Sequence, residues 1–344
     1  MKNLFKILAL VISLIFILLI KDAERISEID KIISGYKFNL ISWELRRLPK
    51  QTIDFFKSSN LTKEEAEKIL NEVDFSRMDN LELYYEKNIS NLIKNELDKN
   101  FLFPPLAISL EKPPKVLIVS PKDKISQKIA ILLSNDISIA EIESIESRID
   151  SLNLSSIILD TGGFAAYPSL INIKKDSNFM ISTISHEWLH HYLFFFPLGR
   201  SYFKGQDMIF INETLADLFA DEIIKNEKNN ESDSIKFFKD FMKETRIKVD
   251  ILLLNDEIDL AEEYMMKRTI ELNNKGYTIR KINQAYFAFH GNYGTSPSST
   301  HNYHEILTEL LGTYNSFNEF LEDIKKVDSV KKLENIINLR SHNN

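Results

Sequence analysis

His186-Glu187-Trp188-Leu189-His190 is the stretch from which the rest of this 344-residue chain is best interpreted. Two histidines four residues apart lie one turn apart on the same face of an α-helix, so both imidazoles can bind one metal ion. A glutamate beside the first histidine can then accept a proton from a water molecule at the open position of that ion. The pentapeptide therefore predicts a helix that carries part of a zinc site together with its general base.

The residues around the pentapeptide predict the same helix independently. Asp176, Ser177 and Asn178 are residue types that begin helices, and apolar residues recur at helical spacing over 179–193. Apart from Glu187, the residues between and around the two histidines carry no charge, so the helix can be buried; they are Ile184, Ser185, Trp188, Leu189 and Tyr192. His191 lies one position off the metal-binding face, and we expect it in the core or behind the ligands.

A catalytic zinc site needs a third protein ligand, with the fourth position left for water or substrate. The best candidate is Glu213, in Asn212-Glu213-Thr214-Leu215-Ala216-Asp217, on a helix predicted to run to about residue 226. Asp217 lies one turn later on the same face, where it can accept a hydrogen bond from a liganding histidine and fix the orientation of the ring. The predicted Zn²⁺ ligands are therefore His186, His190 and Glu213, with Asp217 behind them.

These two segments together resemble the gluzincin metallopeptidases, a group that includes thermolysin and the aminopeptidase N-like enzymes. In that group H-E-x-x-H provides two zinc ligands and the catalytic glutamate, and N-E-x-x-[S/A]-D provides the third ligand and its aspartate partner. The resemblance covers roughly 176–226 and implies these roles for His186, Glu187, His190, Glu213 and Asp217. With its His-His-Tyr continuation and the nearby Pro-Leu-Gly-Arg, the segment is also similar to uncharacterised membrane-anchored bacterial proteins, which adds no substrate.

One part of the group's pattern is missing. The aminopeptidases carry an upstream glutamate that holds the free amine of the substrate. The comparable segment here, 162–168, reads Gly-Gly-Phe-Ala-Ala-Tyr-Pro and contains no carboxylate. The resemblance therefore does not imply specificity for the amino terminus of a peptide.

Gluzincins also have a tyrosine or histidine, downstream of the glutamate ligand, that donates a hydrogen bond to the developing oxyanion. Such a donor contributes most where charge appears only in the transition state. The segment 285–294 contains three candidates, His290, Tyr293 and Tyr286, ahead of a Gly-, Pro- and Ser-rich stretch typical of a loop. The alternative is a helix end with satisfied polar aromatics. His290 and Tyr293 are the catalytic candidates that we retain.

The composition excludes several other kinds of site. A chain that is 44% apolar and 27% charged is typical of a globular protein. The net charge of −7 and the lack of a basic patch with interleaved aromatics argue against a nucleic-acid partner. The chain has no cysteine, which excludes disulfides, cysteine–zinc clusters and thiol nucleophiles.

The N-terminal segment predicts a membrane anchor. Lys2 and Lys6 precede residues 7–20, which are uncharged and almost wholly apolar. No small-x-small cleavage site follows Ile20, which favours an uncleaved anchor over the alternative of a cleaved signal peptide. Because the lysines precede the span, we expect a single-pass protein whose catalytic region lies outside the cytoplasm, periplasmic or extracellular. The opposite orientation remains an alternative.

The remaining pattern predicts an α+β, zincin-like fold: a small mixed sheet, then the H-E-x-x-H helix and a mostly helical C-terminal part. Helices are predicted within 24–100 and near 124–133 and 139–152, and strands at 106–110, 115–120 and 155–160. Residues 164–173 are predicted as a short edge strand. In zincins an exposed edge strand beside the metal binds an extended peptide by main-chain hydrogen bonds, and the position of 164–173 just before the motif helix predicts the same role here. Further helices are predicted at 233–254, 257–274, 278–289, 304–311, 317–326 and 330–339.

The predicted organisation is a signal anchor at 1–23, a helical accessory region at 24–104, a zincin-like catalytic core at 105–226 and a helical C-terminal subdomain at 227–344. The predicted function is that of a membrane-anchored zinc metallopeptidase that hydrolyses peptide or protein substrates, with Glu187 as general base. A catalytically inactive or non-peptidase zincin-like membrane scaffold is the alternative. An intramembrane protease is disfavoured, because charged residues at 174–176 precede the motif.

Overall fold

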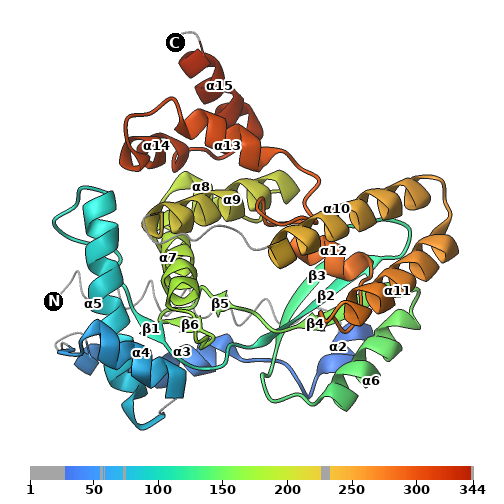
Figure 1. Ribbon diagram of the computed structural model, residues 1–344, viewed down its shortest axis with the longest axis horizontal. Helices are drawn as coiled ribbons and strands as arrows, with labels where there is room; N and C mark the ends of the chain where they lie inside the picture. Colours follow the sequence, from blue (N-terminus) through green and yellow to red (C-terminus); the bar gives the residue numbers. More distant parts are fainter. Residues whose placement is uncertain (1–27, 55–56, 58, 73–74, 226–232, 342–344) are drawn as a thin grey trace, which may run out of the picture.

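The computed structural model describes residues 28–54, 57, 59–72, 75–225 and 233–341, and Figure 1 gives their arrangement. The predicted membrane anchor at 1–23 lies outside these ranges. In the part of the chain that is described, no helix is both long and apolar enough to cross a membrane. The described chain is a mixed α+β structure, as predicted; the zincin-like refinement of that class stays a prediction.

Helices occupy the N-terminal region, which confirms the prediction for 24–100. They are α2 (Glu28–Ile33), α3 (Leu40–Asp54), α4 (Lys63–Glu72) and α5 (Met78–Glu96), with the 3₁₀ turn η2 (Phe75–Arg77) before α5. A capping box begins α4: the backbone N–H of Glu65 donates to Thr62 Oγ1, and that of Thr62 donates to Glu65 Oε2. One face of α5 is buried, and it joins the largest core of the molecule.

Three antiparallel strands form the first sheet, in the order β3-β2-β4. They are β2 (Lys115–Pro121), β3 (Ile129–Leu133) and β4 (Leu154–Leu159). Alternate side chains of β2 point to opposite faces. Leu117 and Val119 pack with α2 and α6 (Ile139–Asp150), whereas Val116 and Ile118 pack with helices from after residue 233. This sheet is therefore covered on both faces.

The helix predicted near 124–133 is wrong, because 129–133 forms the edge strand β3. Its sequence, Ile-Ala-Ile-Leu-Leu, is apolar enough for either structure. The choice is made by pairing with β2, in which Ile129 lies opposite Val119 and Leu133 lies opposite Lys115. Local periodicity could not reveal this pairing, because it describes one segment at a time and contains no information on the neighbouring strand.

A second, smaller sheet lies beside the motif helix, so the single mixed sheet that we predicted is two sheets. Its order is β1-β6-β5, formed by β1 (Ile108–Ser109), β6 (Ser169–Ile171) and β5 (Gly163–Phe164). The predicted edge strand at 164–173 is in fact two strands that pair antiparallel, Gly163 opposite Ile171. Of these two strands, only β5 is at an edge of the sheet, because β6 also pairs in parallel with β1 on its other side.

Helix α7 (Ser177–Leu193) carries the H-E-x-x-H motif and packs against α9 (Gln206–Ile223), with the short α8 (Pro197–Arg200) between them. The Asp176 side chain caps α7 by accepting from the N–H groups of Asn178 and Phe179. Trp188 and Leu189 of α7 are buried in one core with Leu215 and Phe219 of α9. The two helices that carry the motifs therefore share the same apolar core.

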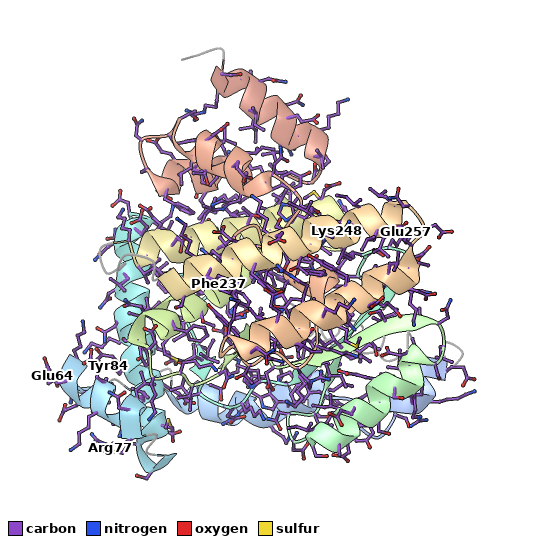
Figure 2. All side chains as sticks on the ribbon, turned by 45° about the vertical axis from the view of Figure 1, so that its right-hand side comes forward. Glu64, Arg77, Tyr84, Phe237, Lys248 and Glu257 are labelled. Carbon is purple, nitrogen blue, oxygen red and sulfur yellow. The ribbon has the colours of Figure 1, made fainter. Side chains whose placement is uncertain are left out.

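The C-terminal helices cover two different parts of the molecule. They are α10 (Asp233–Leu254), α11 (Ile258–Asn274), α12 (Gln284–His290), α13 (Tyr303–Leu311), α14 (Phe317–Ile324) and α15 (Val330–Ser341). The first three pack on the β3-β2-β4 sheet. Of the last three, α13 packs on α9, and α14 and α15 add apolar side chains to the same core at the top of Figure 1. Figure 2 shows Phe237 and Lys248 along α10, and Phe237 stacks on Tyr277 with 5.9 Å between ring centroids. The helices after residue 233 thus contribute to two apolar cores, the one that contains α7 and α9 and the one on the β3-β2-β4 sheet.

The predicted helix at 278–289 is shorter than expected. It begins only at Gln284, because the Asn283 side chain accepts from the N–H of Tyr286 and caps it there. Before the cap, Arg280 forms two hydrogen bonds with Glu146 of α6, at 2.6 and 2.5 Å. Residues 280–283 thus lie outside the helix, where Arg280 and Asn283 donate to the carbonyls of Ile158 and Ser156 in β4.

Candidate metal centre

Helices α7 and α9 bring the three predicted ligands together. One ligand atom from each of His186, His190 and Glu213 lies within 4.8 Å of the other two. Oε2 of Glu213 is 3.4 Å from Nε2 of His186 and 3.6 Å from Nε2 of His190. The two Nε2 atoms are 3.1 Å apart. Two imidazole nitrogens and one carboxylate oxygen around a common point form a donor set that suits Zn²⁺.

Asp217 lies where the sequence predicted it. Its Oδ1 is 3.1 Å from Nδ1 of His186, while Nε2 of the same ring faces Glu213 and His190. A carboxylate on Nδ1 fixes the tautomer that leaves Nε2 free to bind a metal. These described residues therefore fit a three-ligand zinc site with a second carboxylate behind one histidine.

The pKa values of His186 and Glu213 are shifted in opposite directions, because each group stabilises the charged form of the other. Burial lowers the pKa of His186, but hydrogen bonds to Asp217 and Glu213 outweigh that effect and raise it well above its ordinary value. Burial raises the pKa of Glu213, but the neighbouring His190 and His186 outweigh that effect and lower it. Glu213 is thus held as a carboxylate, the form that binds a cation.

Glu187 lies against the second sheet. Its side chain is buried at 8% exposure, and a Cβ atom placed on Gly163 of β5 would lie 2.5 Å from Glu187 Oε1. The backbone of the edge strand therefore touches the predicted general base directly. Burial raises the pKa of Glu187, while His186 and His190 partly oppose that shift. A carboxylate with a raised pKa accepts a proton more readily near neutral pH.

Of the three downstream candidates, the structure brings Tyr293 to the metal-binding residues. The ring centroids of Tyr293 and His186 are 6.4 Å apart. Burial raises the pKa of Tyr293 well above its ordinary value, and the charges of Glu213 and Glu187 add to the shift. Tyr293 therefore stays protonated and can donate a hydrogen bond.

His290 and Tyr286 pack on each other instead, with 4.2 Å between their ring centroids. His290 also packs edge-on against Phe289, and burial lowers its pKa to about 4. Burial raises the pKa of Tyr286 to about 12. Both side chains are therefore neutral at physiological pH, and the contacts found for His290 within the described residues are with aromatic rings.

Tyr202 is a residue at this centre that the sequence interpretation missed. It follows α8, and its hydroxyl donates a hydrogen bond to Oε1 of Glu213. Its ring is 6.2 Å from that of His190 between centroids. Burial and the charge of Glu213 raise the pKa of Tyr202 well above its ordinary value. The only signal in the sequence is a tyrosine between the two motifs, and it has no periodic relation to either.

His191 is partly buried and lies outside the group of candidate ligands, as the sequence interpretation expected. Its ring meets that of Tyr167 edge-on, with 5.5 Å between centroids. Burial lowers the pKa of His191 to about 4. The second histidine of the His-His pair therefore packs on the segment that joins β5 to β6.

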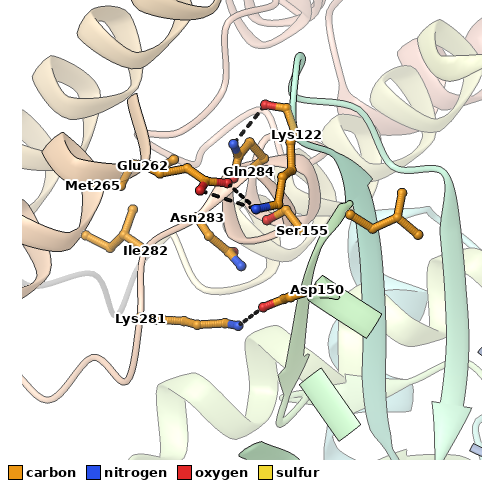
Figure 3. Close-up of a pocket in the computed structure, with 10 residues that line it drawn as sticks. Lys122, Asp150, Ser155, Glu262, Met265, Lys281, Ile282, Asn283 and Gln284 are labelled. Carbon is orange, nitrogen blue, oxygen red and sulfur yellow. Dashed lines mark hydrogen bonds and ion pairs between the residues drawn. The ribbon is translucent and has the colours of Figure 1, made fainter. Parts of the chain in front are cut away.

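A hollow of about 170 Å³ lies elsewhere, between α11, the start of α12 and the start of β4 (Figure 3). Lys122 pairs there with Glu262 at 3.1 Å, and Lys281 pairs with Asp150 at 3.4 Å. Each cation is thus matched by a carboxylate, so the hollow does not present unbalanced charge. None of its lining residues belongs to the metal-binding group.

In comparisons with known proteins, no protein-family model, curated protein or solved structure matches this chain.

Proposed function

We propose that this protein is a zinc-dependent peptidase of gluzincin type, tethered to a membrane by its N-terminal segment. The observation that carries the proposal is the convergence of His186, His190 and Glu213 from two helices. The supporting context is Asp217 behind His186 and Glu187 beside the same group. In the proposed site the two histidines and Glu213 hold the ion, which supplies a lowered pKa for water and polarisation of the scissile carbonyl.

In the proposed mechanism Glu187 moves the proton. Its carboxylate accepts a proton from the attacking water at Oε1 or Oε2 and then donates it to the leaving amine. The raised pKa of this buried group supports the first step, because it makes the carboxylate a stronger base. Burial at 8% exposure also keeps bulk water from competing for the carboxylate.

Two tyrosines supply hydrogen bonds in this proposal. Tyr293, beside His186, is the donor for the negative charge that develops on the carbonyl oxygen. Tyr202 donates to Glu213 and so holds the carboxylate ligand in place. His290, packed among aromatic rings, is a weaker candidate for direct contact with the substrate.

The peptide would lie along β5. This strand is at the edge of its sheet and touches Glu187 through Gly163, so a peptide paired with β5 has its backbone close to the general base. The pairing uses main-chain groups and demands no particular side chain. This mode of binding supports a peptide or protein substrate, and it does not require the substrate to have a free amino terminus.

The test combines metal content with cleavage of a peptide library by wild-type protein and the Glu187→Gln variant. We expect about one zinc per chain in both, and a loss of turnover of at least about a thousandfold in the variant, because the amide cannot accept the proton. Full activity in Glu187→Gln would refute the mechanism. Wild-type protein that holds no metal and cleaves nothing would favour the alternative of a scaffold.

Membrane attachment and orientation need a separate test. The proposal rests on the apolar segment 7–20 and the lysines before it. We expect the full chain in the membrane fraction, with its C-terminal part accessible to protease added outside the cell. Recovery in the soluble fraction would refute the anchor without affecting the proposed chemistry.

A further inference from the structure

The loop after α12 makes a contact with the metal centre that the proposed reaction does not use. Thr295 Oγ1 donates a hydrogen bond of 2.7 Å to Oδ2 of Asp217. The other oxygen of that carboxylate, Oδ1, lies 3.1 Å from Nδ1 of His186. Thr295, Asp217 and His186 therefore form a continuous chain that ends at a metal-binding imidazole.

We propose that Thr295 is a positioning residue, which fixes the Asp217 carboxylate and through it the orientation of the His186 ring. The inference rests on the proposed function, because it assigns His186 to a metal. An aspartate carboxylate rotates easily about its last bond, since this torsion has broad minima. A hydrogen bond to one oxygen leaves that rotation partly open. A second donor on the other oxygen restricts it.

The low exposure of Asp217 and His186 makes this restriction of the carboxylate effective. The Asp217 side chain is 16% exposed and the His186 side chain 14% exposed, so few water molecules reach them. Water can replace the Thr295 hydroxyl only from its outer side, because Thr295 itself is exposed. We therefore expect an effect smaller than the loss of Asp217 itself, which contacts the ligand directly.

Contacts on both sides of Thr295 hold the loop at this place. Before it, Asn292 accepts from Gln206 Nε2 at 2.7 Å and donates to Gln127 Oε1 at 2.9 Å. After it, the carbonyl of Ser298 accepts from Arg246 Nη1 at 3.0 Å. These anchors come from α9, from the segment before β3 and from α10, so the position of Thr295 is set by elements other than the metal-binding helix α7.

Gly294 brings the loop close to α9. A Cβ atom at this position would lie 2.4 Å from Thr214 Oγ1, so only glycine allows the backbone to approach this far. The approach places residue 295 within reach of Asp217, one turn after Thr214 on the same helix. The loop therefore packs closely on α9 next to Thr295, the residue whose hydroxyl contacts Asp217.

The experiment compares Thr295→Val, Thr295→Ser and Ser296→Ala in the full chain. Valine keeps the shape and removes the hydroxyl, serine restores it, and Ser296→Ala removes a neighbouring hydroxyl that accepts from the N–H of Ser298 within the loop. Zn²⁺ affinity is measured by competition with a chromophoric chelator. The absorption spectrum of Co²⁺ in the same site reports ligand geometry independently of activity.

We expect Thr295→Val to bind Zn²⁺ about tenfold more weakly than wild type and to change the Co²⁺ spectrum, because the His186 ring is less restrained. Thr295→Ser and Ser296→Ala should match wild type in both measurements. In the Asp217→Ala background, Thr295→Val should have little additional effect, since removal of both carboxylate oxygens already removes the coupling between the two residues.

Three outcomes would overturn the inference. Wild-type affinity and spectrum in Thr295→Val would show that the hydroxyl positions nothing, while the metal site itself would stand. Equal losses in Thr295→Val and Ser296→Ala would assign the effect to the loop and not to this hydroxyl. Failure of wild-type protein to bind Zn²⁺ or Co²⁺ would refute both the inference and the proposed function.

Discussion

At the scale of single residues, the chemistry of this centre depends on how closely side chains and backbone approach. Gly163 illustrates the point, because a strand backbone lies against the proposed general base, Glu187, with no room between them. Tyr202 and Thr295 each place a hydroxyl on a carboxylate of the centre. These contacts determine where the acidic oxygens point, and with them where protons and metal can bind.

Replacement of Gly163 by alanine should disable catalysis without removing the metal. The new Cβ would lie 2.5 Å from Glu187 Oε1 and 2.9 Å from Thr183 Cγ2, so the carboxylate must move. We expect kcat/KM to fall by about tenfold to a hundredfold, because a displacement of about 1 Å misaligns the base. Zinc stoichiometry should be unchanged. The control is Gly35→Ala, whose Cβ would meet nothing within 4 Å; equal losses in both variants would contradict the explanation.

The partly buried His290 should make stability fall with acid. Burial lowers its pKa to about 4 in the folded state, whereas an unfolded histidine has a pKa near its ordinary 6.5. Between these two values the unfolded chain binds the extra proton, so the free energy of unfolding decreases as the pH falls through this window. One such group contributes at most about 1.4 kcal/mol per pH unit.

Urea unfolding at several pH values checks this contribution. Wild type should lose stability between about pH 6.5 and about pH 4, and His290→Phe should lose less over the same interval, because one titrating group is gone. The same slope in both proteins would show that His290 does not cause the dependence.

At the scale of elements, the centre depends on two helices held in a fixed relation. Local signals start α7, since Asp176 caps it, and the capping box of Thr62 starts α4 in the same way. Packing decides the rest: α7 and α9 bury Trp188 and Phe219 against each other, with ring centroids 5.8 Å apart. The spacing within each motif sets which face its ligands occupy, and the shared core sets the distance between those faces.

The cap of α7 predicts a measurable loss of stability. Asp176→Ala removes acceptors for the N–H groups of Asn178 and Phe179, and we expect the free energy of unfolding to fall by about 1 kcal/mol. Asp176→Asn retains a capping oxygen and should stay close to wild type. Denaturant unfolding of the three proteins gives the comparison. Equal stability of the alanine and asparagine variants would contradict the capping role.

At the scale of the whole molecule, the helices after residue 233 are joined to the sheets before them. Glu146 of α6 is 3% exposed; it accepts from Arg280 and from the N–H of Ile158, and it forms an ion pair with Lys281. These contacts attach the segment before α12 to the first sheet. Since the loop after α12 bears Tyr293 and Thr295, this attachment also sets where the loop reaches the metal centre.

Arg280→Ala should therefore destabilise the protein more than an ordinary surface substitution does. It leaves the buried Glu146 with Lys281 as its remaining cationic partner, and we expect a loss of about 2–3 kcal/mol in the free energy of unfolding, below the cost of an entirely unpaired buried charge. The control is Lys122→Ala, which breaks a partly exposed pair with Glu262 and should cost about 0–1 kcal/mol. Equal losses, measured by urea unfolding, would contradict the linking role of Arg280.

Much of this fold was predictable where signals are local. The bounds of α6, α7 and α10 follow from helical periodicity and caps, and β2 follows from its run of β-branched and apolar residues. Prediction failed where pairing across the chain decides. Residues 129–133 became β3 by pairing with β2, and 164–173 divided into β5 and β6 because each has its own partner.

By itself, the sequence determined the type and helical spacing of the candidate ligands His186, His190 and Glu213, because residues four apart share a face of any helix. It also indicated Asp217 one turn after Glu213. Only the tertiary structure decided that the two faces meet, that Gly163 touches Glu187, and that Tyr293 rather than His290 lies beside His186. The physical reason is range: periodicity describes one element at a time, whereas these contacts are set by packing among distant parts of the chain.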